Sequence, residues 1–119
     1  MVEYKQLLKY AKDEDDFPVS LYLAKTGVTI NWKGNVPDVI LYIPESIFQS
    51  VACSFIEKIG PEDYYSTTIL DSSHVELLCN CTETSHFSEE YKVTLAAIKH
   101  FIESGLNKLS SHYLAFEGP

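Results

Sequence analysis

The residues with the clearest chemical potential are two histidines and two cysteines that lie close together. They are His74, Cys79, Cys81 and His86, and these residue types are the usual ligands of structural zinc. In an unbroken strand, however, both cysteines share a face with the apolar residues Val75 and Leu77, and His74 points to the other face. We therefore expect Cys79 and Cys81 to be reduced core residues, with no bound metal. A disulfide between strand positions i and i+2 would be strained.

Signatures of enzymatic catalysis are missing from the sequence. It contains no Gly-x-Ser-x-Gly elbow, no glycine-rich phosphate loop and no His-Glu-x-x-His pair. His100 falls opposite the apolar stripe of the last expected helix, and Cys53 falls on the polar side of its helix without a nearby histidine. The sequence predicts a protein that is not an enzyme and takes no cofactor.

The charge balance indicates which partners to expect. The chain has nine cationic and seventeen acidic residues, for a net charge of −8, and every cation is lysine. Arginine recognises phosphate and guanine, and a basic patch marks nucleic-acid binding. We therefore expect no nucleic-acid or membrane partner. An acidic surface favours solubility and attracts cationic partners, although such a surface can also be no more than well solvated.

Length and composition bound the architecture. The 119 residues, of which 45% are hydrophobic, fit a single domain over residues 1–119. No apolar run approaches the roughly 20 residues of a membrane helix, and the N-terminus lacks the apolar stretch of a signal peptide. Three cysteines are too few for the disulfide framework of a secreted mini-protein. We expect a cytoplasmic protein.

The first half of the chain predicts a helix, three strands and a second helix. Apolar residues with helical spacing indicate a helix over residues 3–12, ended by four acids and Pro18. Alternation over 19–32 around Gly27 predicts a hairpin, and the apolar run 39–43 a central strand. Pro44 then opens a helix that Gly60 and Pro61 end.

The second half predicts two strands and a long helix. Residues 64–70 are rich in β-formers, 71–73 suit a turn, and 74–82 read as the returning strand. Ser88 is a good N-cap for a final helix, on which Gly105 either breaks the helix or lets a neighbour approach closely. The order α-β-β-β-α-β-β-α predicts a two-layer α+β fold with a twisted, mainly antiparallel five-stranded sheet.

Two surfaces are candidates for protein contacts. Tyr4, Leu7 and Leu8 share a helical face near the terminus, so we expect them to bind a partner unless they simply seal the sheet. The second helix carries an apolar stripe that Ile47 and Ile56 widen to about half of the circumference. One sheet can hardly cover both flanks, which predicts a homodimer interface unless loops cover them instead. The interface residues would be Ile47, Phe48, Val51, Phe55 and Ile56.

The predicted order of elements resembles the class I chaperones of bacterial type III secretion, small acidic proteins that bind effectors before export. The last helix is similar too, from Glu89-Glu90-Tyr91 through Phe101-Ile102 to His112-Tyr113. The absence of arginine and the early hairpin depart from the family. The resemblance implies a homodimeric virulence chaperone without cofactor or ATP use, with an extended effector segment laid across apolar patches.

A second hypothesis is an immunity or antitoxin protein. Such proteins are also small, acidic and free of cofactors, and they cap a basic toxin domain. A chaperone should bind an extended segment by strand addition with weak salt dependence. An inhibitor of a basic toxin should associate fast and lose association rate steeply as salt is added.

Overall fold

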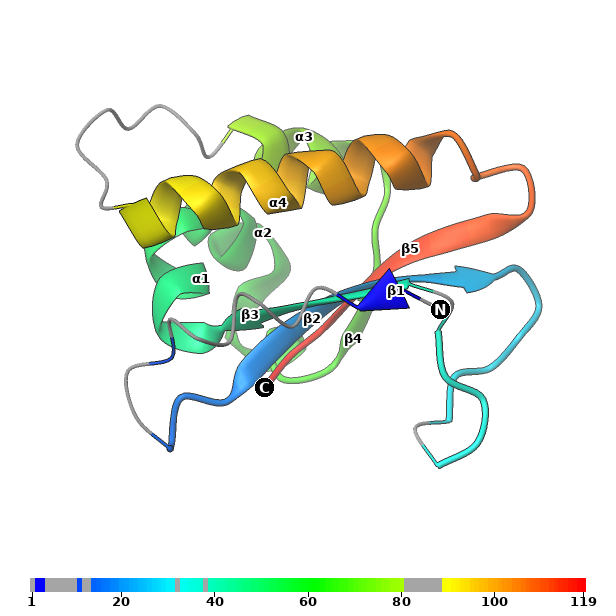
Figure 1. Cartoon of the computed structure of the whole chain (residues 1–119), viewed down its shortest axis with the longest axis horizontal. Coiled ribbons are helices and arrows are strands. Elements are labelled where there is room, and N and C mark those ends of the chain that lie inside the picture. The colour runs from blue at the N-terminus through cyan, green and yellow to red at the C-terminus, as the bar shows by residue number, and fades with distance from the viewer. Residues whose placement is uncertain (1, 4–10, 12–13, 32, 38, 81–88) are drawn as a thin grey trace.

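A computed structural model describes residues 2–3, 11, 14–31, 33–37, 39–80 and 89–119 (Figure 1). Its centre is a sheet with the strand order β1-β3-β2-β5-β4. Four strands form an antiparallel set: β2 (Pro18–Lys25), β3 (Val39–Pro44), β4 (Thr67–Ile69) and β5 (His112–Glu117). The two-residue β1 (Val2–Glu3) pairs in parallel with β3 at one edge.

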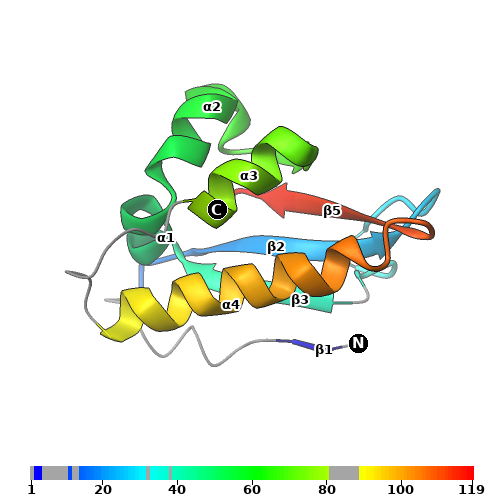
Figure 2. The ribbon, with the colours of Figure 1, turned by 90° about the horizontal axis from the view of Figure 1, so that it is seen from above.

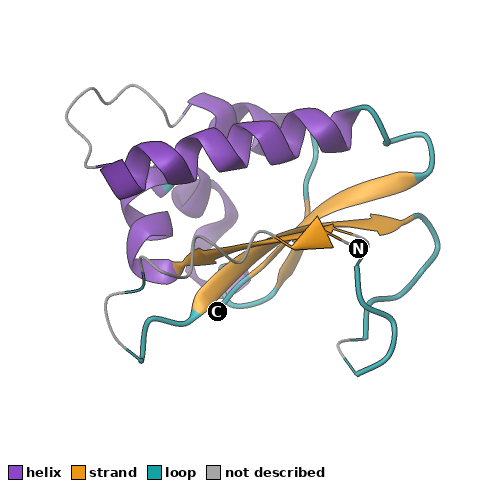
Figure 3. Ribbon diagram, viewed as in Figure 1, coloured by secondary structure: helices purple, strands orange, loops and turns teal. Residues whose placement is uncertain are grey.

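The helices gather on one side of this sheet (Figures 2 and 3). They are α1 (Glu45–Val51), α2 (Cys53–Asp63), α3 (Ser72–Asn80) and α4 (Glu89–Leu106). On the other side lies the connection between β2 and β3 (Figure 1). The described residues therefore form an α+β fold with a helical layer on one face of a mainly antiparallel sheet, and that part of the prediction is confirmed.

Strand alternation builds the main core between the two layers. Leu21 of β2 lies opposite Leu41 of β3 and Phe116 of β5, and all three are fully buried beneath the helices. Phe116 stacks on Phe48 of α1 with ring centroids 5.4 Å apart, and meets Phe55 of α2 edge-on at 5.2 Å. Burying such rings removes large apolar areas from water, which fixes the sheet against α1 and α2.

The helical region after Pro44 matches the prediction with one refinement. A helix begins directly after Pro44, but the chain leaves helical geometry at Ala52, which separates α1 from α2. Gly60, with φ of 86°, interrupts α2 near the predicted end. The start of α1 is capped from a distance, because the Asp16 carboxylate accepts hydrogen bonds from Ser46 N–H at 3.0 Å and Ser46 Oγ at 2.6 Å.

The predicted order of elements is wrong at two described places. Residues 28–31 form no strand, and a turn follows them in which Gly34 N–H donates to the Asn31 carbonyl at 2.9 Å. Residues 74–80 belong to α3, not to a strand. Asp71 caps this helix: its Oδ1 accepts from His74 N–H at 3.0 Å and from Ser73 Oγ at 2.7 Å.

Strand β5 is a further element that the sequence did not predict. It lies between β2 and β4 and so holds the sheet together. The expected helix over 3–12 falls almost wholly outside the described residues, although Glu3 itself lies in β1. Because the observed order differs from α-β-β-β-α-β-β-α, the likeness to type III secretion chaperones loses its topological basis.

Candidate functional site

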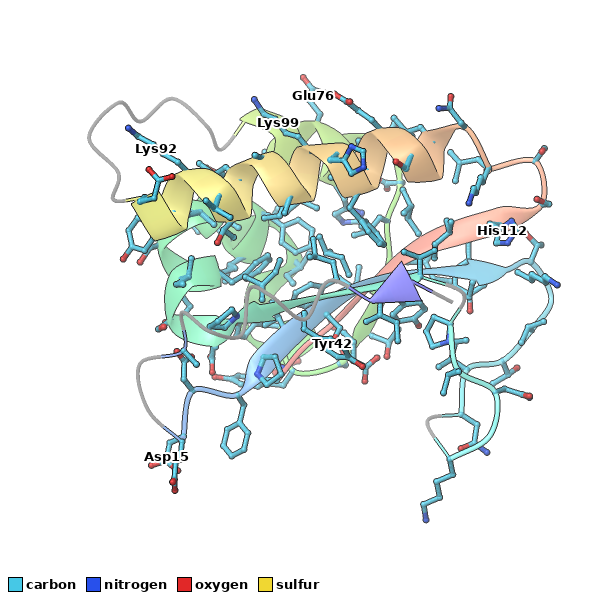
Figure 4. All side chains as sticks on the ribbon, in the orientation of Figure 1. Asp15, Tyr42, Glu76, Lys92, Lys99 and His112 are labelled. Atoms are coloured by element: carbon cyan, nitrogen blue, oxygen red, sulfur yellow. The ribbon has the colours of Figure 1, made fainter. Side chains whose placement is uncertain are left out.

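The face of the sheet turned away from the helices has its own side chains and its own small core. Tyr22 and Ala24 of β2, Ile40 of β3 and Ala115 of β5 are buried there, with Ile30, Tyr42 and Tyr113 packed against them. Figure 4 shows Tyr42 on this side, opposite Glu76, Lys92 and Lys99 of the helical layer. We call it the outer face.

The connection between β2 and β3 covers part of the outer face. Gly27, with φ of 87°, turns the chain at the end of β2, and Val28 N–H donates to the Lys25 carbonyl at 3.1 Å. Tyr113 of β5 then donates its hydroxyl hydrogen to the Val28 carbonyl, also at 3.1 Å. This bond ties the connection to the sheet at one end of the outer face.

A pocket of about 740 Å³ opens between this connection and β4. Tyr22 and Tyr113 meet edge-on there, with ring centroids 6.3 Å apart. Apolar side chains of the connection and of β4 form much of its walls, and hydroxyl groups and one carboxylate provide the polar part. The outer-face pocket is lined by Tyr22, Thr26, Gly27, Val28, Thr29, Ile30, Thr67, Ile69, Tyr113 and Glu117.

Glu117 sets the charge of the outer-face pocket. Its carboxylate accepts a hydrogen bond from the Thr67 hydroxyl on the neighbouring strand. The pKa of Tyr22 rises to about 12, chiefly because the phenol is buried and then because Tyr113 and Glu117 lie close by. Glu117 is the one charged side chain among the described residues that line the pocket.

Strand β4 forms the free edge of the sheet beside this pocket. The N–H of Leu70 donates to the Leu114 carbonyl at 2.9 Å, and the N–H of Gly118 donates to the Ser66 carbonyl at 3.2 Å. In an antiparallel ladder, alternate residues turn their backbone groups to opposite sides. Thr67 and Ile69 consequently direct theirs away from β5, where no described strand pairs with them. The Ile69 side chain is 64% exposed.

The structure places the expected dimer residues inside a single chain. Ile47, Phe48 and Phe55 are fully buried and Val51 is 2% exposed, while Ile56 is half-buried against the same core. α4 packs on α1 and α3 packs on α2, so these residues contribute to the core of the single chain, and the homodimer stays a prediction. The expected partner patch, Tyr4, Leu7 and Leu8, lies outside the described residues.

The histidines and cysteines separate into different settings. His74 packs edge-on against Phe55 with ring centroids 5.9 Å apart, and its Nδ1 accepts from Asp71 N–H at 3.2 Å. Cys79 lies in α3, so its expected place on the inner face of a strand is wrong, and Cys81 and His86 lie outside the described residues. His100 is exposed on α4, as predicted. Among the described residues, no three His, Cys, Asp or Glu side chains gather where they could hold a metal ion.

The outer-face pocket was missed because its walls come from segments that look unrelated in the sequence. Tyr113 and Glu117 alternate with Leu114 and Phe116, which is a strand signal. The predicted last helix extended to His112-Tyr113, and no strand was predicted for the residues after it. Because β5 was not predicted, its pairing with β4, which places Glu117 opposite Thr67, was not predicted either.

Comparisons with known proteins give no further guide to this site. No protein-family model matches the chain, and searches of curated proteins and of solved structures found no match. In the part of the chain that the structure describes, no helix is both long and apolar enough to cross a membrane.

Proposed function

We propose that this protein binds an extended segment of another polypeptide by strand addition at β4, and that it acts without catalysis. Such binding is the mode expected of a cytoplasmic chaperone similar to those of type III secretion. The observation that carries the proposal is the β4 edge, where Thr67 and Ile69 present backbone groups that pair with no described strand, beside an exposed apolar side chain.

The surroundings of β4 support this use of the edge. Proteins usually protect such edges by keeping the strand short, or with charged side chains, proline or a covering segment. β4 is short, but its three residues, Thr67, Thr68 and Ile69, include neither a charge nor a proline. An added strand would gain main-chain hydrogen bonds from the edge and side-chain contacts from the outer-face pocket.

The net charge of −8 favours the alternative, an immunity protein that neutralises a basic toxin domain. Long-range attraction between unlike charges raises the association rate and is screened by salt. Strand addition depends on short-range hydrogen bonds and apolar contacts, which salt screens little. The two functions therefore differ in how binding responds to ionic strength.

The test begins with the proteins encoded beside this gene, each co-expressed with the chain and purified as a complex. Hydrogen exchange should show the amides of Thr67 and Ile69 protected in the complex. Ile69→Pro removes an edge N–H and should weaken binding at least tenfold, whereas Ile69→Thr keeps that N–H and should cost less. Unchanged affinity of Ile69→Pro, with the fold intact by circular dichroism, would exclude strand addition at β4.

Salt dependence then separates the two functions. Association rates are measured at about 50 mM and about 500 mM salt, where the screening length differs several-fold. Nearly constant rates support the chaperone-like mode. A fall of about tenfold or more, together with unprotected β4 amides, supports the immunity role and rejects the chaperone-like one.

A further inference from the structure

The geometry of the sheet determines what an added strand would bring to the outer-face pocket. Side chains alternate between the two faces of a sheet, and neighbouring strands lie about 4.8 Å apart. Thr67 and Ile69, whose backbone groups face the free edge, also line the outer-face pocket with their side chains. A strand paired with β4 would therefore place every second side chain next to this pocket.

Strands β2–β5 contribute one charged side chain to the outer face. In strands β2–β5, all of which the structure describes, the residues with outward register include one charged side chain, Glu117. Lys25 of β2 lies opposite His112 of β5 in the strand register, and both have the inward register. Neither therefore neutralises Glu117 on the outer face. Among the described residues, no lysine or histidine forms an ion pair with Glu117.

Glu117 also lies within reach of an added strand. It is directly opposite Thr67 in the register of β4 and β5, and the Thr67 hydroxyl donates a hydrogen bond to one of its carboxylate oxygens. A basic side chain from a strand beyond β4 would cross Thr67 or Ile69 before its charged end reached the carboxylate. Its aliphatic stem would then lie against Ile69 and the ring of Tyr113, which suits the amphipathic character of lysine and arginine.

We propose that the outer-face pocket binds an arginine or lysine side chain of the added segment, with Glu117 as its counter-ion. This inference rests on the proposed strand addition and gives it a specificity: the preferred segments carry a basic residue among apolar, β-forming neighbours. The charge complementarity is local, because it comes from one half-buried carboxylate and not from the overall charge of the protein.

The experiment uses two seven-residue peptides with blocked ends. The first has the sequence Thr-Val-Thr-Arg-Thr-Val-Thr. The second peptide replaces arginine by citrulline, a neutral isostere. Both are titrated into the ¹⁵N-labelled full chain, and the amide signals of Thr67, Ile69 and Glu117 report on the site. The arginine peptide should bind roughly threefold to tenfold more tightly, as expected for a charge-assisted pair in a partly buried site.

Two variants connect this preference to Glu117. Glu117→Gln should abolish the difference between the two peptides. Glu76→Gln makes the same change of charge on the helical side, away from the pocket, and should leave the difference unchanged (Figure 4). A preference for arginine that survives Glu117→Gln would overturn the assignment of this carboxylate.

The outcomes also separate this inference from the proposed function. Equal binding of the two peptides, with shifts at Thr67 and Ile69, would reject the basic side chain but keep strand addition. Blocked arginine alone binding as tightly as the arginine peptide would show a site for small cations and reject the strand. Absence of shifts with either peptide at millimolar concentration would overturn both proposals.

Discussion

Gly105 of α4 lies directly against Leu114 of β5. A Cβ atom added to this glycine would be 2.6 Å from Leu114 Cδ2 and 3.2 Å from Leu114 Cγ, and both residues are buried. Of the two roles that the sequence left open for Gly105, the structure supports the close approach of a neighbour, because α4 continues through it to Leu106. Because glycine has no side chain, α4 can pack closely against β5 at this position.

Gly105→Ala should therefore destabilise the protein, although alanine favours helix by up to about 1 kcal/mol. Overpacking a core costs about 1–3 kcal/mol, so the net loss should be near 1 kcal/mol in urea unfolding. In the Leu114→Val background the same substitution should become nearly neutral, because valine removes the crowding atoms. Ser104→Ala, on the exposed side of the same turn, is the control. Equal costs of Gly105→Ala in both backgrounds would contradict the contact.

Phe116 should be the most costly aromatic residue to truncate. Its ring contacts Phe48 of α1, Phe55 of α2 and Tyr64 at the end of α2. Phe116→Ala should lower the free energy of unfolding by about 3–5 kcal/mol, since the cavity lies where these segments meet. Phe17, which is 60% exposed, supplies the matched control, and Phe17→Ala should change stability by less than about 0.5 kcal/mol.

Asp16 should stabilise α1 through Ser46, which lies thirty positions later in the chain. Asp16→Ala leaves the first turn of α1 without its carboxylate and should cost about 1 kcal/mol. Asp16→Asn keeps one acceptor oxygen and should cost less. The exposed Glu14→Ala serves as a control for charge, and thermal unfolding of the four proteins gives the comparison. If Glu14→Ala cost as much as Asp16→Ala, net charge and not capping would explain the effect.

Asp71 should contribute to stability against acid. Hydrogen bonds from Ser73 and from the backbone of His74 lower the pKa of its carboxyl from 3.8 to about 2. The folded state thus prefers the ionised form, so this contribution is complete above pH 3.8 and disappears as the pH falls through about 2. Asp71→Asn should flatten the fall of the melting temperature in that window, and the ¹³C shift of the Asp71 carboxyl should titrate near pH 2. A carboxyl that titrates near 4 would contradict the cap.

Tyr22 should limit stability in alkali. Its pKa of about 12 lies above the ordinary value of 10.0, so the folded state prefers the neutral phenol. That contribution is complete below pH 10 and is lost as the pH rises through about 12. Absorbance at 295 nm should show a late-titrating phenol that is missing in Tyr22→Phe. Tyr64, whose pKa burial and Glu45 also raise, requires Tyr64→Phe as a second reference.

Elements formed by short-range interactions could be predicted from the sequence, and those that depend on distant residues could not. Strands β2 and β3 and the helices after Pro44 and near Ser88 follow from patterns that lie within each segment. The prediction of a strand at residues 74–80 was wrong. Val75, Leu77 and Cys79 alternate as in a strand, but Val75 and Leu78 share a face of the helix that forms there. The carboxylate of Asp71 helps decide between them, and a short window of hydrophobicity does not register such a cap.

The outer-face pocket could not be predicted for a related reason. Its floor needs Tyr22 beside Tyr113, and these residues are brought together by the pairing of β2 with β5. No local pattern indicates which distant strand will enter a sheet between two others. The candidate interface from the sequence relied on helix faces, and the described helices at 45–63 use theirs for the core.

The central place of β5 has a consequence for how this protein is made. Until the ribosome has added residues 112–117, β4 has no described partner strand and one edge of β2 is open. The waiting strand, Val19 to Ala24, is almost entirely apolar, and such an edge readily pairs with other chains. A chain that stopped after α4 would leave this edge open to pairing with other chains, whereas residues 112–117 close the gap between β2 and β4.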